Sequence, residues 1–193
     1  MNLPNTLTVA RIFLVPLLVV VLLTKFETSW PFGFSKEILG AAIFGIASLT
    51  DWADGYLARR RKQVTGFGEW MDPLADKLLI TAALISLVQL DRAPAWMVAV
   101  ILGREFAVTV LRSVAYAKGF AMPASPLGKV KLVAQVVAVL VLILGRGHLQ
   151  GFVVVGRIAL WVATITAIVS ALDYSRRFNA LLAKGAATSH PVP

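Results

Sequence analysis

Cysteine is absent from this 193-residue sequence, and acidic residues are scarce. Without cysteine the chain cannot form disulfides or a thiolate metal site. Only 10 residues are acidic against 19 basic ones, so the net charge is +9. A basic excess can indicate nucleic-acid binding, but here the basic residues fall between apolar stretches rather than along one face. We therefore expect no nucleic-acid partner and attribute the charge to membrane topology and anionic lipid.

Polar residues are too few for an ordinary soluble domain. Hydrophobic residues make up 58% of the chain, whereas about 45–50% is usual. A bilayer-spanning helix needs about 20 mostly apolar residues. Six stretches fit this length: 6–24, 36–58, 72–90, 94–117, 129–146 and 151–175. The sequence therefore predicts an all-α integral membrane protein with six transmembrane helices.

The two ends of the chain are more polar than the spans. Pro4 suits a first helical turn with Asn2 as its cap, which predicts a short interfacial helix before the chain enters the membrane near Phe13. Residues 1–183 are expected to form one membrane domain, and residues 184–193 a disordered tail. Thirteen basic residues fall on one side of the predicted spans and five on the other, with Arg104 mid-span. The positive-inside rule then predicts both termini in the cytoplasm.

Half of the acidic residues lie between Asp51 and Asp76, in the stretch DWADGYLARRRKQVTGFGEWMDPLAD. Asp51 and Asp54 are three apart, and Asp72 and Asp76 are four apart, so each pair shares one face of a helix. Carboxylates at the edge of hydrocarbon are costly and indicate a functional site. Mg²⁺ prefers carboxylate oxygens and is often shared with substrate phosphates. Four carboxylates on neighbouring helices can hold two metals about 4 Å apart, an arrangement that clamps a phosphoryl group.

Small residues accompany these carboxylates. Gly55 and Ala58 lie on the face of Asp51, and Gly68 lies four residues before Asp72, so a ligand or a helix can approach the backbone there. Arg59 can offer a planar fork to a phosphate. The alternative interpretation is that the carboxylates only pair with the basic run 59–62 at the membrane surface. The regular spacing and the companion glycines favour the binding site.

The pattern Asp51-x2-Asp54-Gly55-x2-Ala58-Arg59-x8-Gly68-x3-Asp72-x3-Asp76 resembles, at every position, the signature of the CDP-alcohol phosphotransferases. The resemblance implies a membrane enzyme with six transmembrane helices, usually a homodimer, that transfers a phosphatidyl or similar group from a CDP-linked donor to an alcohol and releases CMP. It also implies that the four aspartates bind two Mg²⁺ or Mn²⁺ ions and that Asp76 is the general base. The residues that it implies at the CDP-lipid site are Asn5, Thr8, Asp51, Asp54, Gly55, Ala58, Arg59, Gly68 and Asp72. Asn5 and Thr8 have the alternative role of capping the interfacial helix.

Three further motifs indicate the acceptor. Leu3-Pro4-Asn5-x2-Thr8-x2-Arg11, Met71-Asp72-Pro73-x-Ala75-Asp76-Lys77 and Gly128-Lys129-Val130-Lys131 are similar to bacterial members of the family that use sn-glycerol 3-phosphate. This similarity implies CDP-diacylglycerol as donor, with phosphatidylglycerol phosphate and CMP as products, in the cytoplasmic membrane of a bacterium. Leu132 stands where that pattern has threonine.

Basic residues of the fourth and fifth predicted spans suit such an acceptor. Arg104 and Arg112 are eight apart and are expected to reach one cavity, with Lys129 and Lys131 beside them. A dianionic acceptor needs cations of this kind, and a neutral alcohol does not. The structural alternatives are that Arg104 pairs with Glu105 and that the lysines extend to the interface. Glu105 itself is placed to orient Arg112, seven residues later.

Other functions remain open on the sequence alone. Within the family the alternatives are a cardiolipin synthase, a phosphatidylinositol phosphate synthase and a phosphatidylserine synthase. Intramembrane prenyltransferases also use aspartate motifs, but on separated segments, whereas the four aspartates here fall within 26 residues. A divalent-cation transporter would also need intramembrane acids. Against it, the cluster sits at one membrane face, and Arg104, deeper in the span, would repel cations.

Overall fold

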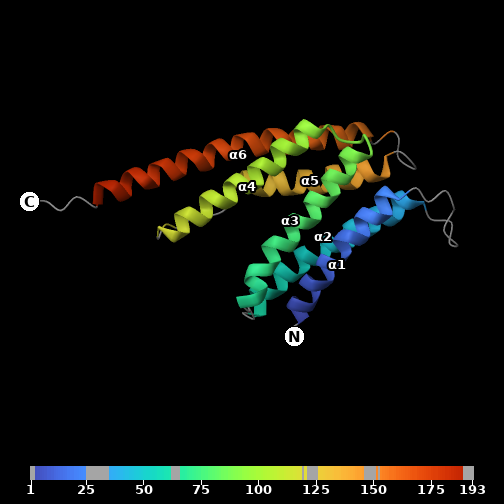
Figure 1. Ribbon diagram of the computed structural model, residues 1–193, viewed down its shortest axis with the longest axis horizontal. Helices are drawn as coiled ribbons and strands as arrows, with labels where there is room; N and C mark the ends of the chain where they lie inside the picture. Colours follow the sequence, from blue (N-terminus) through green and yellow to red (C-terminus); the bar gives the residue numbers. More distant parts are fainter. Residues whose placement is uncertain are drawn as a thin grey trace, which may run out of the picture.

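A computed structural model describes residues 3–24, 35–61, 66–118, 120, 126–145, 151 and 153–188. Side chains are described within residues 9–24, 35–50, 75, 77–118, 120, 128, 130–145, 151 and 153–181. The described chain is all-α and contains no strand (Figure 1). Its helices are α1 (Leu3–Leu23), α2 (Lys36–Arg61), α3 (Gly66–Gln89), α4 (Ala95–Ala117), α5 (Pro126–Leu144) and α6 (Val153–Thr188).

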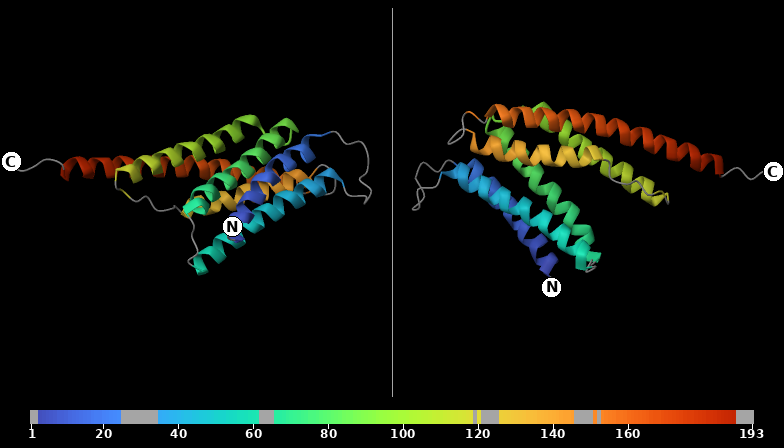
Figure 2. Two further views of the ribbon diagram at one scale, coloured as in Figure 1. Left: turned by 60° about the horizontal axis from the view of Figure 1, so that its bottom comes forward. Right: turned by 180° about the vertical axis from the view of Figure 1, so that it is seen from behind.

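The helices pack in two groups that share one core. Helix α1 packs against α2 and α3, while α6 packs against α4 and α5. Contacts of α2 and α3 with α5, and of α3 with α4, join the two groups. The end of α2 and the starts of α1 and α3 lie close together in every view, apart from the C-terminal end of α6 (Figure 2). The segment that holds the aspartate motif therefore lies where one helix ends and two others begin.

Large apolar residues fill the core, and glycines stand where helices approach closely. Phe44, Leu84 and Ile101 are fully buried. A Cβ atom on Gly40 would lie 2.6 Å from Leu22 Cδ2, and a Cβ atom on Gly156 would lie 2.9 Å from Leu142 Cδ2. Small residues at these two crossings let α1 approach α2 and let α5 approach α6. The fold thus depends on glycine at helix crossings as well as on apolar burial.

Many large apolar side chains point outward. Phe13, Phe106 and Val133 are 71%, 64% and 63% exposed, and other large apolar side chains are exposed along α1, α4, α5 and α6. A soluble monomer rarely exposes so much contiguous apolar surface. Within the described residues, one stretch of 29 residues, Val153–Leu181, is long and apolar enough to cross a membrane, and an 18-residue window of it has a mean hydropathy of 2.0. The apolar stretches Val9–Leu23, Lys77–Gln89 and Val130–Leu144 are shorter. The number of spans therefore stays a prediction.

Two predicted boundaries differ from the structure. Residues 3–23 form a single helix with Pro16 inside it, so the segment predicted to lie at the interface is continuous with the first predicted span. Helix α6 continues to Thr188, so residues 184–188, predicted as part of a disordered tail, are helical. Residues 189–193 lie outside the described residues, and the division into domain and tail stays a prediction.

Candidate active site

Two neighbouring helices carry the four aspartates. Asp51 and Asp54 lie in the last three turns of α2, and Asp72 and Asp76 lie in the first three turns of α3. Helix α2 packs against α3, and the end of α2 lies beside the start of α3 (Figure 2), so the two pairs stand on neighbouring helix ends. The predicted helical placement of both pairs is thus confirmed. Their side chains lie outside the described part of the structure, so their joint role as metal ligands stays a prediction.

The chemistry of this donor set fits a hard divalent cation. Four carboxylates on adjoining helix ends offer only oxygen ligands, which suit Mg²⁺ or Mn²⁺ better than softer metals. Gly55, Ala58, Arg59 and Gly68, predicted at the nucleotide, also lie outside the residues whose burial and contacts are described. So do Asn5 and Thr8, although their backbone belongs to the start of α1, near the end of α2 and the start of α3 (Figure 1).

A buried polar cluster joins α4, α5 and α6. Arg104 Nη1 lies 2.9 Å from Glu105 Oε1, and Lys131 Nζ pairs with that same oxygen. The other guanidinium nitrogen of Arg104, Nη2, donates to Ser170 Oγ, and the guanidinium carbon lies 5.7 Å from the centroid of the Tyr174 ring. The Arg104 and Lys131 side chains are only 8% and 5% exposed. One carboxylate thus bridges two buried cations from different helices.

The structure brings together two of the four residues predicted to bind the acceptor. Arg104 and Lys131 meet through Glu105, whereas Arg112 is exposed on α4, and the Lys129 side chain lies outside the described residues. The expectation that Arg104 and Arg112 reach one cavity receives no support, because eight residues turn a helix by roughly 80° beyond two full turns. Glu105 pairs with Arg104 and Lys131 rather than serving only to orient Arg112. Lys131 is buried, so its side chain does not extend to the interface.

A hydrogen-bonded chain links this cluster to the aspartate motif. Lys77 Nζ donates to Thr109 Oγ1 at 2.6 Å, and Thr109 Oγ1 donates to the Glu105 carbonyl at 2.6 Å. Lys77 directly follows Asp76 on α3, and Thr109 lies one turn after Glu105 on α4. The hydrogen bond therefore ties α3 to α4 beside Asp76. Sequence reasoning assigned no role to Lys77 or Thr109. The only available signals were that Lys77 follows the motif and that Thr109 lies one turn after Glu105.

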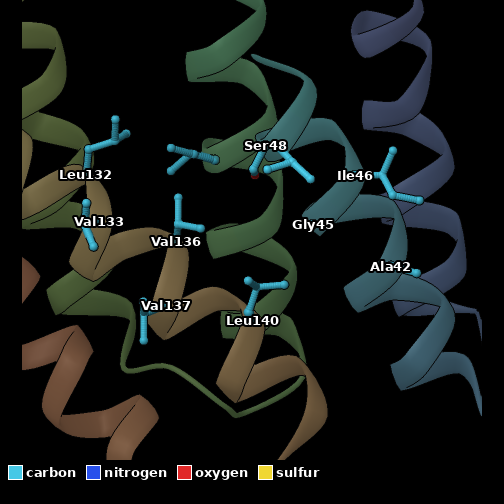
Figure 3. Close-up of a pocket in the computed structure, with 11 residues that line it drawn as sticks. Ala42, Gly45, Ile46, Ser48, Leu132, Val133, Val136, Val137 and Leu140 are labelled. Carbon is cyan, nitrogen blue, oxygen red and sulfur yellow. The ribbon is translucent and has the colours of Figure 1, made fainter. Parts of the chain in front are cut away.

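An apolar groove runs between α2 and α5 (Figure 3), and Ile80 of α3 also lines it. Its cavity volume is about 650 Å³, and Ser48 is the sole polar side chain among its eleven lining residues. Ala42, Gly45 and Ser48 form a stripe of small residues three apart on α2, which leaves the space open. Leu132 and Val133 border it on α5. The groove reaches Leu49, two residues before Asp51, and it was not predicted from the sequence.

Comparisons with known proteins identify the class. A family model described as CDP-alcohol phosphatidyltransferase matches residues 1–169. The chain belongs to this family of membrane proteins.

Named relatives agree with that assignment. A Bacillus subtilis (strain 168) protein named CDP-diacylglycerol–glycerol-3-phosphate 3-phosphatidyltransferase is 47% identical over 193 residues, covering 93% of this chain and 97% of the relative. A Rickettsia felis protein of the same name is 38% identical, covering 90% and 93%. A Pseudomonas fluorescens protein, also of that name, is 34% identical, covering 91% and 89%.

Proposed function

We infer that the chain is an enzyme that transfers the phosphatidyl group of CDP-diacylglycerol to sn-glycerol 3-phosphate. The products are phosphatidylglycerol phosphate and CMP. One observation carries this inference: the chain is 47% identical, over nearly its whole length, to a relative named for that reaction. The predicted motif on the adjoining ends of α2 and α3 supports it independently, because such a donor set suits a diphosphate substrate.

The reaction is a single displacement at phosphorus. The acceptor hydroxyl oxygen attacks the phosphorus that carries diacylglycerol, the bond from that phosphorus to the CMP oxygen breaks, and the hydroxyl proton passes to the Asp76 carboxylate. CMP leaves with the electron pair of the broken bond. Two Mg²⁺ or Mn²⁺ ions, bound by Asp51, Asp54, Asp72 and Asp76, would neutralise charge on the diphosphate.

The donor lipid would span two regions of the protein. Asn5 and Thr8 on α1, with Gly55, Ala58, Arg59 and Gly68 around the loop between α2 and α3, would hold the CDP moiety. An acyl chain would lie in the groove between α2 and α5. The groove favours this placement because its lining is apolar and it begins half a helical turn from Asp51. A lipid placed in this way keeps its chains in an apolar environment while its diphosphate reaches the aspartates.

The acceptor phosphate would bind the basic cluster. Arg104 and Lys131 are preassembled side by side, and Arg112 and Lys129 would complete the set from α4 and α5. The hydrogen bond from Lys77 to Thr109 supports this assignment, because it ties the helix of the general base to the helix of Arg104.

The family, the relatives and the proposed substrates indicate the location and topology of the enzyme. The chain is a bacterial membrane protein by family and relatives. We propose that it crosses the cytoplasmic membrane six times, works as a homodimer, and has both its termini and its active site facing the cytoplasm. The excess of basic residues on that side and the water-soluble acceptor support this orientation.

A comparison of acceptors tests the assignment. The purified chain is incubated with CDP-diacylglycerol and Mg²⁺, and CMP release is measured with glycerol 3-phosphate, inositol phosphate, serine or phosphatidylglycerol. Glycerol 3-phosphate is expected to give the highest kcat/KM. A higher value with phosphatidylglycerol, inositol phosphate or serine would identify the corresponding synthase and overturn the proposed acceptor.

A further inference from the structure

Glu105 holds an unusual position for an acidic residue in a site that is meant to bind an anion. Its Oε1 atom accepts from Arg104 Nη1 on its own helix and from Lys131 Nζ on α5. Its side chain is 23% exposed, more than that of either cation. The carboxylate is therefore the most accessible of the three charged groups.

Arg104 does not depend on Glu105 alone for its placement. It is held from α6 by Ser170 Oγ and by the face of the Tyr174 ring. Tyr174 and Ser170 are themselves buried. Lys131 is buried on α5, a helix that packs against α6. The contacts with α6 would thus keep Arg104 in place if the carboxylate swung outward.

Charge balance shows what the carboxylate does. Arg104 and Lys131 are both buried and share the Glu105 carboxylate as a counter-charge, and a buried cation that loses its counter-charge is costly. A phosphate dianion would balance both cations and offers three oxygens instead of the single oxygen that Glu105 uses. A monoanion could only match the charge of the carboxylate, and a neutral hydroxyl compound could not replace that charge at all.

We propose that Glu105 is an internal counter-anion that occupies the acceptor-phosphate subsite when the subsite is empty and is displaced by a dianionic phosphate. It is a positioning residue, since it acts through Arg104 and Lys131 and does not touch the substrate. Its consequence is selectivity: a dianion competes with the tethered carboxylate more strongly than a monoanion or a neutral compound does. This inference rests on the proposed function, because it assumes that the cluster binds the acceptor.

Displacement of Glu105 by phosphate and a purely structural role of Glu105 predict opposite changes in anion affinity when the carboxylate is removed. If a tethered carboxylate occupies the subsite most of the time, the apparent affinity of a phosphate is the intrinsic affinity multiplied by the small fraction of time that the subsite is open. Glu105→Gln removes the competing charge, so anions are expected to bind more tightly. A purely structural role would instead make binding weaker, because the cations would lose their organiser.

The experiment measures anion affinity in the full-length purified chain with CDP-diacylglycerol and Mg²⁺. Glu105→Gln is expected to lower the KM for glycerol 3-phosphate and the inhibition constant of inorganic phosphate about 3- to 10-fold, with kcat changed less than about 3-fold. Glu105→Asp, with a shorter carboxylate that reaches the cations less well, is expected to shift both constants in the same direction by less. If Glu105→Gln does not fold, Glu105→Asp provides the test of displacement.

Asp91→Asn is the matched control. It also converts a carboxylate to an amide, but in the exposed turn between α3 and α4, at a φ of 55° that asparagine tolerates, and it should leave both constants unchanged.

Two outcomes overturn the inference, and a third concerns only the function. Unchanged or weaker phosphate binding in a folded Glu105 variant would show that the carboxylate is a scaffold and not a competitor. Equal tightening in Asp91→Asn would show a general charge effect. If the wild-type chain releases CMP without any requirement for glycerol 3-phosphate, the proposed function fails, whatever the Glu105 variants do.

Discussion

Replacing Arg92 with methionine is expected to destabilise the helix bundle while leaving the reaction intact. Arg92 lies in the turn between α3 and α4. Its Nη1 atom donates to the Ile143 carbonyl at 2.6 Å and more weakly to the Leu142 carbonyl at 3.4 Å, at the C-terminal end of α5. Its Nη2 atom lies 3.1 Å from Glu37 Oε1, in the first turn of α2. One guanidinium therefore joins the ends of three helices.

The magnitude follows from burial. The Arg92 and Glu37 side chains are 8% and 14% exposed. Removing one partner of a buried ion pair costs about 3–5 kcal/mol, because it leaves the other charge uncompensated. Glu37 retains some solvent and lies at a helix N-terminus, where the dipole favours a carboxylate, so we expect about 3 kcal/mol. For a domain of this size, that corresponds to a fall in Tm of roughly 6–12 °C.

Thermal unfolding of the purified chain in detergent measures this effect, with CMP release below the transition as the control. The double variant Arg92→Met with Glu37→Gln should recover part of the lost Tm, because it removes the unpaired carboxylate as well. Turnover should stay within about 2-fold of wild type, because 14 residues of helix place Glu37 roughly 21 Å from Asp51. A Tm within 2 °C of wild type, or a loss of kcat in a variant with unchanged Tm, would refute the structural role given to Arg92.

Three further predictions concern the site. Asp76→Asn is expected to retain CDP binding, measured by titration calorimetry, but to lower kcat about 100-fold or more, and near-normal turnover would exclude the general-base role. Lys77→Met removes the hydrogen bond to Thr109 and is expected to lower kcat/KM for glycerol 3-phosphate up to about 10-fold. The exposed Lys118→Met serves as its control, and equal losses in both variants would show that the bond has no specific role. Gly45→Phe should fill the apolar groove and raise the KM for long-chain CDP-diacylglycerol more than for a dioctanoyl analogue. Gly45→Ala should be tolerated, because its Cβ would lie 3.7 Å from Leu140 Cδ2, and equal effects of Gly45→Phe on both lipids would place the acyl chain elsewhere.

The parts of the molecule that were predictable from sequence are those governed by local periodicity. Asp51 and Asp54, three apart, and Asp72 and Asp76, four apart, were expected on helix faces, and both pairs do lie within helices. Apolar stretches likewise predicted helices near the observed ones. Their ends were less predictable, because small residues such as Gly-Ala-Ala-Thr at 185–188 are compatible with both helix and coil, and in the structure they extend α6.

Contacts between helices could not be predicted in the same way. The alternatives for Arg104 included a pair with Glu105, which the structure contains, but the second cation on that carboxylate comes from α5, and no spacing rule connects the two helices. The hydrogen bond between Lys77 and Thr109 spans 32 residues. The groove depends on a stripe of small residues on α2 meeting α5, and such a stripe also occurs at closed helix crossings. These features are set by tertiary packing, which one sequence does not specify.

The most direct measurement follows both products of one reaction. Purified chain is given CDP-diacylglycerol, Mg²⁺ and carbon-labelled glycerol 3-phosphate, and CMP in the aqueous phase is compared with label in the lipid phase. Transfer of the phosphatidyl group to this acceptor predicts one labelled lipid formed for each CMP released, and neither product in the absence of the acceptor. CMP release without label in the lipid would show hydrolysis or another acceptor and would contradict the assigned reaction.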